Sequence, residues 1–201
     1  MRVALKDLEA PARIVPSRPM TDAEYADFCA KNPDLRIERT STGDIVVMPP
    51  TGGESSYRNS SLTAQLHVWA RRDGRGKTFD SNAEFILPSG AARAPDASWV
   101  SREQLARLTR EEKRGFPPLC PEFVVELMSP SDRLEDVLAK MDEYLASGAT
   151  LGWVLDPDGR IAYVCRPGRP TERLVAPAEL RGEGPVEGFV LELAEIWDPD
   201  L

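Results

Sequence analysis

The chain has little of the chemistry that histidine and cysteine supply. Its 201 residues include one histidine, His67, and three cysteines, Cys29, Cys120 and Cys165. A Ser-His-Asp triad or a thiol–imidazole pair needs a histidine at the right place, and a multi-histidine metal site needs more than one. We expect His67 to be exposed, because it points away from the apolar stripe of the helix predicted around it. Any chemistry must therefore be carried mainly by carboxylates and lysine.

The sequence also lacks signals for export or for insertion into a membrane. No apolar stretch reaches the length of a transmembrane helix. An acid, Asp7, stands too early for a signal peptide, so we expect a cytoplasmic protein with no membrane partner. The cysteines are odd in number and lack zinc-ligand spacing, so we expect them to be reduced and structural.

Basic side chains are outnumbered, with 25 Lys and Arg against 33 Asp and Glu, which gives a net charge of -8. Nucleic-acid affinity depends mainly on Lys and Arg contacts to phosphates, so this balance argues against a broad nucleic-acid footprint. The charge is uneven, because residues 51–120 carry more bases than acids and residues 121–201 carry far more acids than bases. That asymmetry is not a basic patch in itself.

The chain divides into two parts by pattern. Residues 1–20 are rich in proline and arginine without periodicity, and we expect them to form an N-terminal arm. Residues 21–201 are enough for one sizeable core and short for two, which predicts a single domain.

Helical and extended patterns alternate along this domain. Helices are predicted to begin near Thr21, Glu54 and Asp132, with capping pairs formed by Thr21 with Glu24 and by Asp132 with Glu135. Alternating or β-branched runs predict strands at residues 35–39, 44–48, 77–80, 84–87, 93–100, 122–128, 151–155 and 161–165. The fold class is therefore α/β of the mixed (α+β) kind, a mixed β-sheet flanked by helices.

Glu126 is the most informative residue of the sequence. It lies in an apolar run that predicts a buried strand, where an ionised carboxylate costs several kcal/mol unless it is paired or binds a metal. Asp96 lies near the start of another predicted strand. If the two strands are neighbours, both carboxylates can bind one magnesium or manganese ion, which prefers such oxygens. By itself, Asp96 is equally compatible with a solvated strand end.

Two other charged residues each have two interpretations. Glu54 lies on the core-facing side of its helix and is either aimed inward or a first-turn acid that complements the helix dipole. Lys140 lies on the flank of the helix after the Glu126 strand. It either leans toward the sheet or forms an ion pair with Asp136 four residues earlier.

Four segments together resemble a known family. They are residues 50–54 (PTGGE), 93–100 (RAPDASWV), 121–127 (PEFVVEL) and 140–144 (KMDEY). The chain resembles the PD-(D/E)XK nuclease superfamily, and within it the restriction-endonuclease branch called the Uma-two family. The resemblance spans roughly residues 35–197 and implies a restriction-endonuclease-like core.

The resemblance implies a metal-dependent endonuclease that hydrolyses phosphodiester bonds of DNA. In the superfamily an aspartate, a second acid and a lysine surround a divalent ion, which assigns Asp96 and Glu126 to Mg²⁺ or Mn²⁺ and adds Glu54 as a further acid. The superfamily's lysine is expected two residues after the second acid, where this chain has Met128, which cannot carry a charge. The resemblance suggests that the lysine has moved to the following helix, as Lys140.

The sequence indicates the residues that contact the substrate less clearly than the metal ligands. Arg58, Arg93 and Arg133 are predicted phosphate contacts, with exposed surface charges as the alternative. A homodimer is one possible arrangement, because paired subunits conveniently make two cuts across a duplex, but no residue pattern indicates an interface. The alternative function is a catalytically inactive nuclease-fold module that binds DNA or a protein partner, which Met128 and the acidic surface favour.

Overall fold

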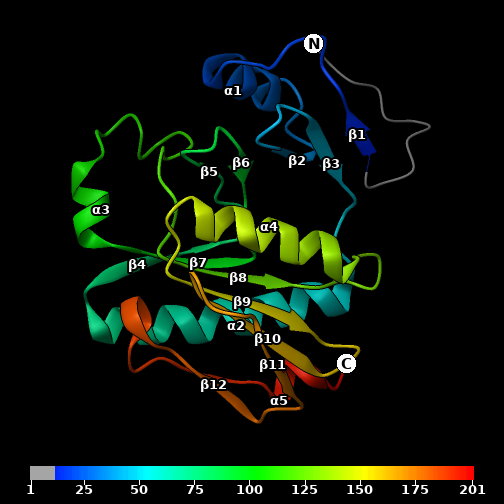
Figure 1. Cartoon of the computed structure of the whole chain (residues 1–201), viewed down its shortest axis with the longest axis vertical. Coiled ribbons are helices and arrows are strands. Elements are labelled where there is room, and N and C mark those ends of the chain that lie inside the picture. The colour runs from blue at the N-terminus through cyan, green and yellow to red at the C-terminus, as the bar shows by residue number, and fades with distance from the viewer. Residues whose placement is uncertain (1–11) are drawn as a thin grey trace.

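A computed structural model describes residues 12–201 of the chain. Its centre is a six-stranded sheet with the strand order β11-β10-β9-β8-β7-β4 (Figure 1). Neighbouring strands are antiparallel except β8 and β9, which are parallel. These strands are β4 (Gly76–Asp80), β7 (Ala97–Ser101), β8 (Phe123–Leu127), β9 (Leu151–Asp156), β10 (Ile161–Cys165) and β11 (Glu172–Val175).

Helices cover both faces of this larger sheet. Helix α4 (Leu134–Ala146) connects β8 to its parallel neighbour β9 and lies on one face, and helix α2 (Gly53–Asp73) lies on the other (Figure 1). The α2 face is completed by C-terminal elements, whose buried residues join the same core. They are β12 (Glu179–Arg181), the 3-10 helix η1 (Gly184–Val186), β13 (Val190–Glu192) and α5 (Ala194–Trp197).

A smaller five-stranded sheet, with the order β1-β3-β2-β6-β5, lies beside the larger one (Figure 1). Helix α1 (Asp22–Ala30) packs on it through Tyr25 and Phe28, and begins with the predicted capping box of Thr21 and Glu24. The strands are β1 (Ala12–Ile14), β2 (Arg36–Arg39), β3 (Ile45–Met48), β5 (Phe85–Ile86) and β6 (Ala92–Arg93). Helix α3 (Arg102–Arg107) follows β7 at the edge of the larger sheet.

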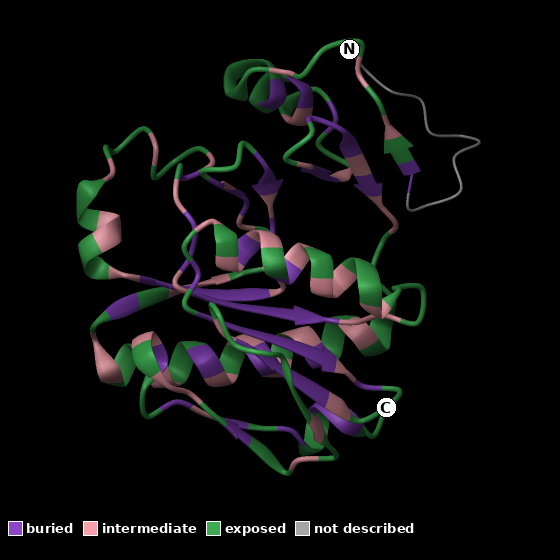
Figure 2. Cartoon of the chain, viewed as in Figure 1, coloured by how far each residue is buried: buried purple, intermediate pink, exposed green. Residues whose placement is uncertain are grey.

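The central strands are buried on both faces, and alternation decides which face each side chain enters. Strands β7, β8, β9 and β10 are buried along nearly their whole lengths, whereas α2 and α4 bury only the sides that face the sheet (Figure 2). Along β8, Phe123 and Val125 pack toward α2, and Val124 packs toward α4. A sheet covered on both faces explains why the strand around Glu126 reads as continuously apolar.

The mixed α/β fold class predicted from the sequence is confirmed. Two local predictions are wrong. The predicted strand at residues 93–100 is divided between the two sheets, since β6 ends at Arg93 and β7 begins at Ala97, and Pro95, which has no backbone N–H to donate, lies at the break.

In addition, Asp132 does not cap α4. The helix begins at Leu134 with Arg133 as its N-cap residue and no side-chain cap. The Asp132 carboxylate instead accepts hydrogen bonds from the backbone N–H and hydroxyl of Ser129, both at 2.7 Å, which closes the preceding turn.

The predicted N-terminal arm falls mostly on residues 1–11, which lie outside the described residues. Its last part contains β1, in which Ala12 pairs with Val47 of β3. The division into an arm and a single domain remains a prediction. Among residues 12–201, no helix combines the length and apolar character of a membrane span.

Candidate active site

Asp96 and Glu126 lie opposite one another on neighbouring antiparallel strands. The register pairs Ala97 with Val125, so Asp96, one residue before β7, stands across from Glu126 near the end of β8. Both side chains share the face that Val124 presents to α4, because side chains alternate along a strand. The Asp96 Oδ2 atom accepts a hydrogen bond of 2.8 Å from the backbone N–H of Leu127. The two strands therefore bring both carboxylates to one place.

Lys140 reaches this place from α4. Its Nζ atom lies 2.9 Å from Oε1 of Glu126 and 2.9 Å from Oε1 of Glu38. Tyr144, one turn later on the same helix face, donates a hydrogen bond of 3.0 Å to Oε1 of Glu126. In the structure the Lys140 side chain leans toward the sheet, which is the first of its two interpretations. It forms ion pairs with Glu126 and Glu38 rather than with Asp136.

Asp96, Glu126, Lys140 and Glu38 form one cluster of charged side chains. Glu38 is the member that the sequence did not reveal. It comes from β2 of the smaller sheet, and its side chain is 1% exposed. Besides Lys140, it accepts hydrogen bonds from Nη1 of Arg93 at 3.0 Å and from the backbone N–H of Ala94 at 3.1 Å. Within its own hairpin Glu38 occupies a polar position of an alternating strand, so only the packing of β6 and α4 against that strand buries it.

The electrostatic state of the cluster follows from burial and from these pairs. Burial raises the pKa of Glu126 to about 7, a shift that Lys140 opposes and that Asp96 and Glu38 reinforce. Burial also disfavours a charged Glu38, yet Lys140 and Arg93 hold the pKa of Glu38 below its ordinary value. Although burial opposes its charge, Glu126 and Glu38 raise the pKa of Lys140. Lys140 is therefore a cation between two acids at neutral pH.

The three arginines predicted to contact phosphate occupy different environments. Arg93 belongs to the cluster, but its guanidinium is shared between Glu38 and Glu143, with Nε at 2.6 Å from the Glu143 carboxylate. Arg58 is buried and donates from Nε to the carbonyl of Ile196 at 2.8 Å. Arg133 is exposed and lies 3.8 Å from Glu135. Of these three arginines, only Arg93 contacts Glu38, the acid that also binds Lys140.

Glu54 is not brought to the other predicted acids. It lies at the start of α2, which packs on the opposite face of the larger sheet, and its side chain is 59% exposed and paired with Arg58 at 3.3 Å. Throughout residues 12–201, no three His, Cys, Asp or Glu side chains are grouped closely enough to hold one ion. Glu54 therefore does not add a third ligand to Asp96 and Glu126 in this arrangement.

The two remaining carboxylates nevertheless fit a divalent ion. Magnesium is usually held by one or two carboxylates, with water and substrate phosphate oxygens completing its coordination. Asp96 and Glu126 are two such hard ligands on the same face. The mutual repulsion that helps raise the pKa of Glu126 is the kind of interaction that a bound cation relieves. The residues that would hold Mg²⁺ or Mn²⁺ are therefore Asp96 and Glu126.

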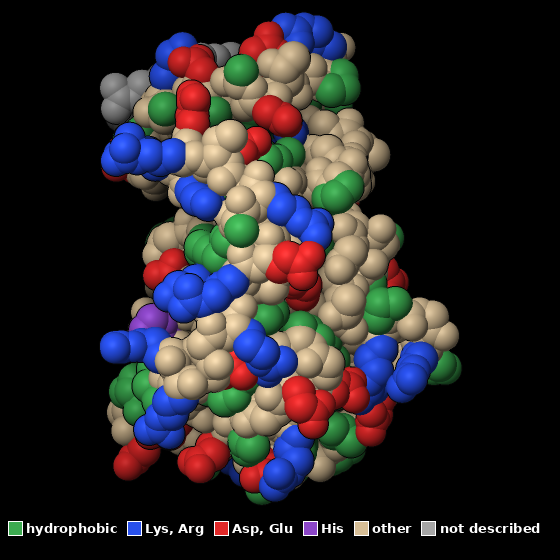
Figure 3. All heavy atoms as spheres, turned by 90° about the vertical axis from the view of Figure 1, so that its left-hand side faces the viewer, with side chains coloured by type: hydrophobic (Ala, Val, Ile, Leu, Met, Phe, Trp, Pro, Cys, Tyr) green, Lys and Arg blue, Asp and Glu red, His purple; other side chains and the backbone are tan. Residues whose placement is uncertain are grey.

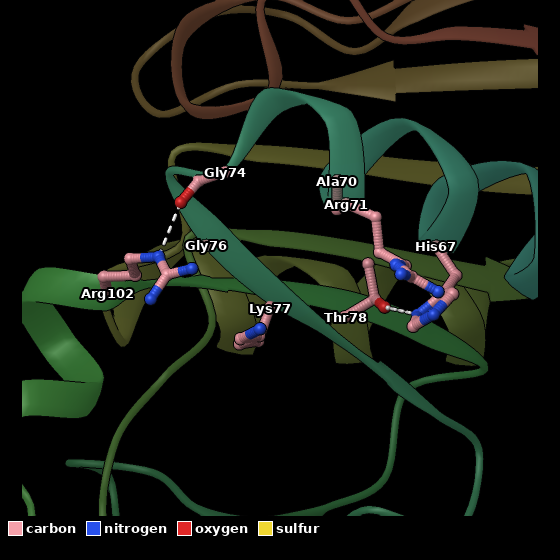
Figure 4. Close-up of a pocket in the computed structure, with 8 residues that line it drawn as sticks. All are labelled: His67, Ala70, Arg71, Gly74, Gly76, Lys77, Thr78 and Arg102. Carbon is pink, nitrogen blue, oxygen red and sulfur yellow. Dashed lines mark hydrogen bonds between the residues drawn. The ribbon is translucent and has the colours of Figure 1, made fainter.

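A shallow pocket of about 140 Å³ lies elsewhere, between the C-terminal half of α2 and β4 (Figure 4). In it, Nδ1 of His67 lies 2.9 Å from the Thr78 hydroxyl, and the His67 side chain is exposed, as the sequence predicts. The pocket is at the Ser101 end of β7, away from Asp96. On this side of the molecule Lys and Arg side chains lie around the histidine with acids among them (Figure 3). The pocket has no acid in its lining and is not a cation site.

Comparisons with known proteins bear on the family and the fold of the chain. The model of the Uma2 family, described as "Putative restriction endonuclease", matches residues 22–194. A solved structure from Anabaena variabilis ATCC 29413, described as "a putative nuclease belonging to DUF820", has a TM-score of 0.72. It is 20% identical to this chain, and the match covers 89% of this chain and 98% of that one, which shows that the two share a fold. No curated protein matches the chain.

Proposed function

Since the chain belongs to the Uma2 family, described as "Putative restriction endonuclease", we propose that it is a metal-dependent endonuclease that hydrolyses phosphodiester bonds of DNA. The family supports a nuclease function. The observation that carries the proposal is the position of Lys140, whose ammonium lies 2.9 Å from Glu126, the acid that faces Asp96 across β7 and β8. An aspartate, a second acid and a lysine thus meet at one point of the sheet.

Asp96 and Glu126 are the proposed ligands of Mg²⁺ or Mn²⁺. When bound, such an ion lowers the pKa of a coordinated water and stabilises negative charge on a phosphoryl oxygen. The backbone N–H of Leu127 fixes Asp96, and the Tyr144 hydroxyl fixes Glu126. The two carboxylates are therefore held in place before any substrate arrives.

Lys140 is the proposed electrostatic catalyst. Its ammonium is charged at neutral pH, because Glu126 and Glu38 raise its pKa. A fixed cation in a buried site stabilises the charge that develops on the phosphate in the transition state. Met128, two residues after Glu126, packs partly buried beside the α4 core and supplies no charge. Lys140, on α4, thus supplies the positive charge that Met128 does not.

Substitution of Asp96 tests the proposal. Purified wild type is expected to nick or linearise supercoiled plasmid DNA with Mg²⁺ or Mn²⁺ and not with EDTA. Asp96→Asn should lower the rate about 100-fold or more while its thermal unfolding stays cooperative. Glu103→Gln, an exposed acid on α3 purified in parallel, controls for the loss of one carboxylate and should cleave like wild type. Cleavage by Asp96→Asn at the wild-type rate would indicate a contaminating nuclease and contradict the proposal.

A second function is favoured by Met128, which occupies the place of the superfamily's lysine. It is a non-catalytic module that binds DNA or a protein partner. Such a module would show no metal-dependent cleavage in the wild type, so Asp96→Asn would have no activity to lose. Cleavage by the wild type and its loss in Asp96→Asn exclude this second function.

A further inference from the structure

Arg36 is the charged residue closest to Asp96 on the side of the smaller sheet. It begins β2, two positions before Glu38, so both side chains leave the same face of that strand. Its Nη2 atom lies 3.3 Å from Oδ1 of Asp96, while Oδ2 of the same carboxylate is bonded to Leu127. Arg36 therefore covers the oxygen of Asp96 that the backbone leaves free.

The hydrogen bonding of Arg36 is incomplete. A guanidinium has five N–H donors, and within residues 12–201 that of Arg36 makes one hydrogen bond, at the long end of the accepted range. Its Nε is buried and has no hydrogen-bond partner among residues 12–201. Arg36 is also one-third exposed, so part of its side chain is open to an incoming ligand. A buried donor without a partner is costly, and a bound acceptor would remove that cost.

The neighbouring arginines have their donors in use. Arg39, on the same strand, is 3% exposed and bonds the carbonyls of Gly90 and Met20 and the carboxylate of Asp22. Arg93 bonds the carboxylates of both Glu38 and Glu143. Among the arginines at this junction of the two sheets, Arg36 alone combines a weak pair, an unused donor and exposure.

Electrostatics determines what Arg36 does when the site is occupied. A divalent cation bound to Asp96 and Glu126 neutralises the carboxylate that attracts Arg36. The same cation repels the Arg36 guanidinium. A phosphodiester brought to the same cation presents two oxygens, which match the planar fork of arginine better than any other cationic side chain. The favourable movement of Arg36 is therefore from Asp96 to the phosphate.

We propose that Arg36 is a phosphate-binding residue of the site, which covers Asp96 in the free protein and transfers to a phosphodiester of the nucleic acid when Asp96 and Glu126 hold a cation. This inference rests on the proposed nuclease function and names the group that recognises its substrate. The smaller sheet would then take part directly in substrate binding, because Arg36 is a residue of its strand β2.

Arg36→Gln tests the transfer with two measurements that should move in opposite directions. Mn²⁺ affinity, measured by the free-ion signal in electron paramagnetic resonance, should rise because a competing cation has left Asp96. Affinity for a 20-base-pair duplex in Ca²⁺, measured by fluorescence anisotropy, should fall about 10- to 100-fold, the loss expected for a charge-assisted hydrogen bond. The slope of log K against log salt should decrease by about 0.9, the value for one phosphate contact.

Arg13→Gln is the matched control, because Arg13 also comes from the smaller sheet and pairs with one carboxylate, that of Asp44. It should leave Mn²⁺ affinity, duplex affinity and the salt slope unchanged. Arg36→Lys is the second variant, for use also if Arg36→Gln does not fold. It keeps the charge and loses the fork, so its duplex affinity should fall while its Mn²⁺ affinity stays near that of the wild type.

The results separate this inference from the proposed function. If the wild type cleaves and Arg36→Gln binds the duplex with unchanged affinity and salt slope, Arg36 is not a phosphate ligand although the nuclease function stands. Equal losses of Mn²⁺ and duplex affinity would show that Arg36 only supports the structure, which also overturns the inference. If the wild type binds the duplex without cleaving it, and Arg36→Gln weakens that binding while raising Mn²⁺ affinity, the nuclease function fails and the role of Arg36 stands.

Discussion

The two faces of the larger sheet are built from the same strands and have opposite chemistry. Toward α2, aromatic rings pack together, with Phe123 and Trp153 in edge contact at 4.9 Å and Trp153 stacked on Phe189 at 5.8 Å. Toward α4, strand β8 presents Glu126 to Lys140. One residue of difference along β8 thus separates a packed apolar face from a buried charged one. Alternation of side chains along the strands lets one face stabilise the fold while the other holds charged groups that would not be tolerated alone.

The largest effect should come from breaking the charged face. Lys140→Met removes the cation shared by Glu38 and Glu126, and we expect a loss of about 3 kcal/mol in the free energy of unfolding at pH 8, with cleavage reduced about 100-fold. The destabilisation should be smaller at pH 6, because Glu126 can then be protonated. Urea unfolding and plasmid cleavage measure the two effects.

The control for this change is Lys31→Met, since Lys31 is exposed and pairs with Asp27 on α1. It should alter stability by less than about 1 kcal/mol and leave cleavage unchanged. If Lys140→Met were as stable and active as this control, the charged cluster would have neither role.

Breaking the apolar face should affect stability alone. Phe123→Ala leaves a cavity among fully buried aromatic side chains, with an expected loss of about 3 to 5 kcal/mol in urea unfolding. Its cleavage rate per folded molecule, measured well below the unfolding midpoint, should stay within a few-fold of wild type. A loss of activity as large as that of Lys140→Met would contradict the separation of the two faces.

The smallest effect concerns Glu84, a buried acid that accepts a hydrogen bond from the Tyr25 hydroxyl. Burial raises the pKa of Glu84 to about 7 from an ordinary value of 4.5. Between these values the folded state holds a proton that the unfolded chain has lost, so the free energy of unfolding falls as pH rises through this window. The Glu84 contribution to this slope should approach about 1 kcal/mol per pH unit.

Glu84→Gln should flatten that dependence, as urea unfolding at pH 4.5, 5.5, 6.5 and 7.5 would show. Some slope should remain, because the pKa of Glu126 is raised in the same direction. The exposed variant Glu103→Gln should keep the full wild-type slope. An identical slope in Glu84→Gln and wild type would mean that folding does not raise the pKa of Glu84.

Local sequence patterns predicted most of the fold and the core of the candidate site. Strand alternation located the segments that contain Asp96 and Glu126, and helical spacing placed Lys140 on the flank of α4. It could not choose between Asp136 and the sheet as the partner of Lys140, because that choice depends on how α4 packs. Glu54 shows the same limit, since its helix lies on the far face of the sheet and its partner is Arg58.

Glu38 and Arg36 escaped prediction for a different reason. Each is a polar residue of an alternating strand, and within the isolated hairpin such residues face solvent. Their burial and their contacts arise only when the smaller sheet meets α4 and the start of β7, at sequence separations of 102 residues for Lys140 with Glu38 and 60 for Arg36 with Asp96. No local pattern carries that information.

The bond between Glu38 and Lys140 also sets when the site can exist during synthesis. Glu38 is synthesised early, Arg93 follows after 55 residues, and Lys140 follows only after 102. A nascent chain that stops before α4 has no lysine at the site, and contacts of such long range form slowly. The proposed cleavage activity therefore requires a chain synthesised at least through α4 and the folding of β2 against that helix.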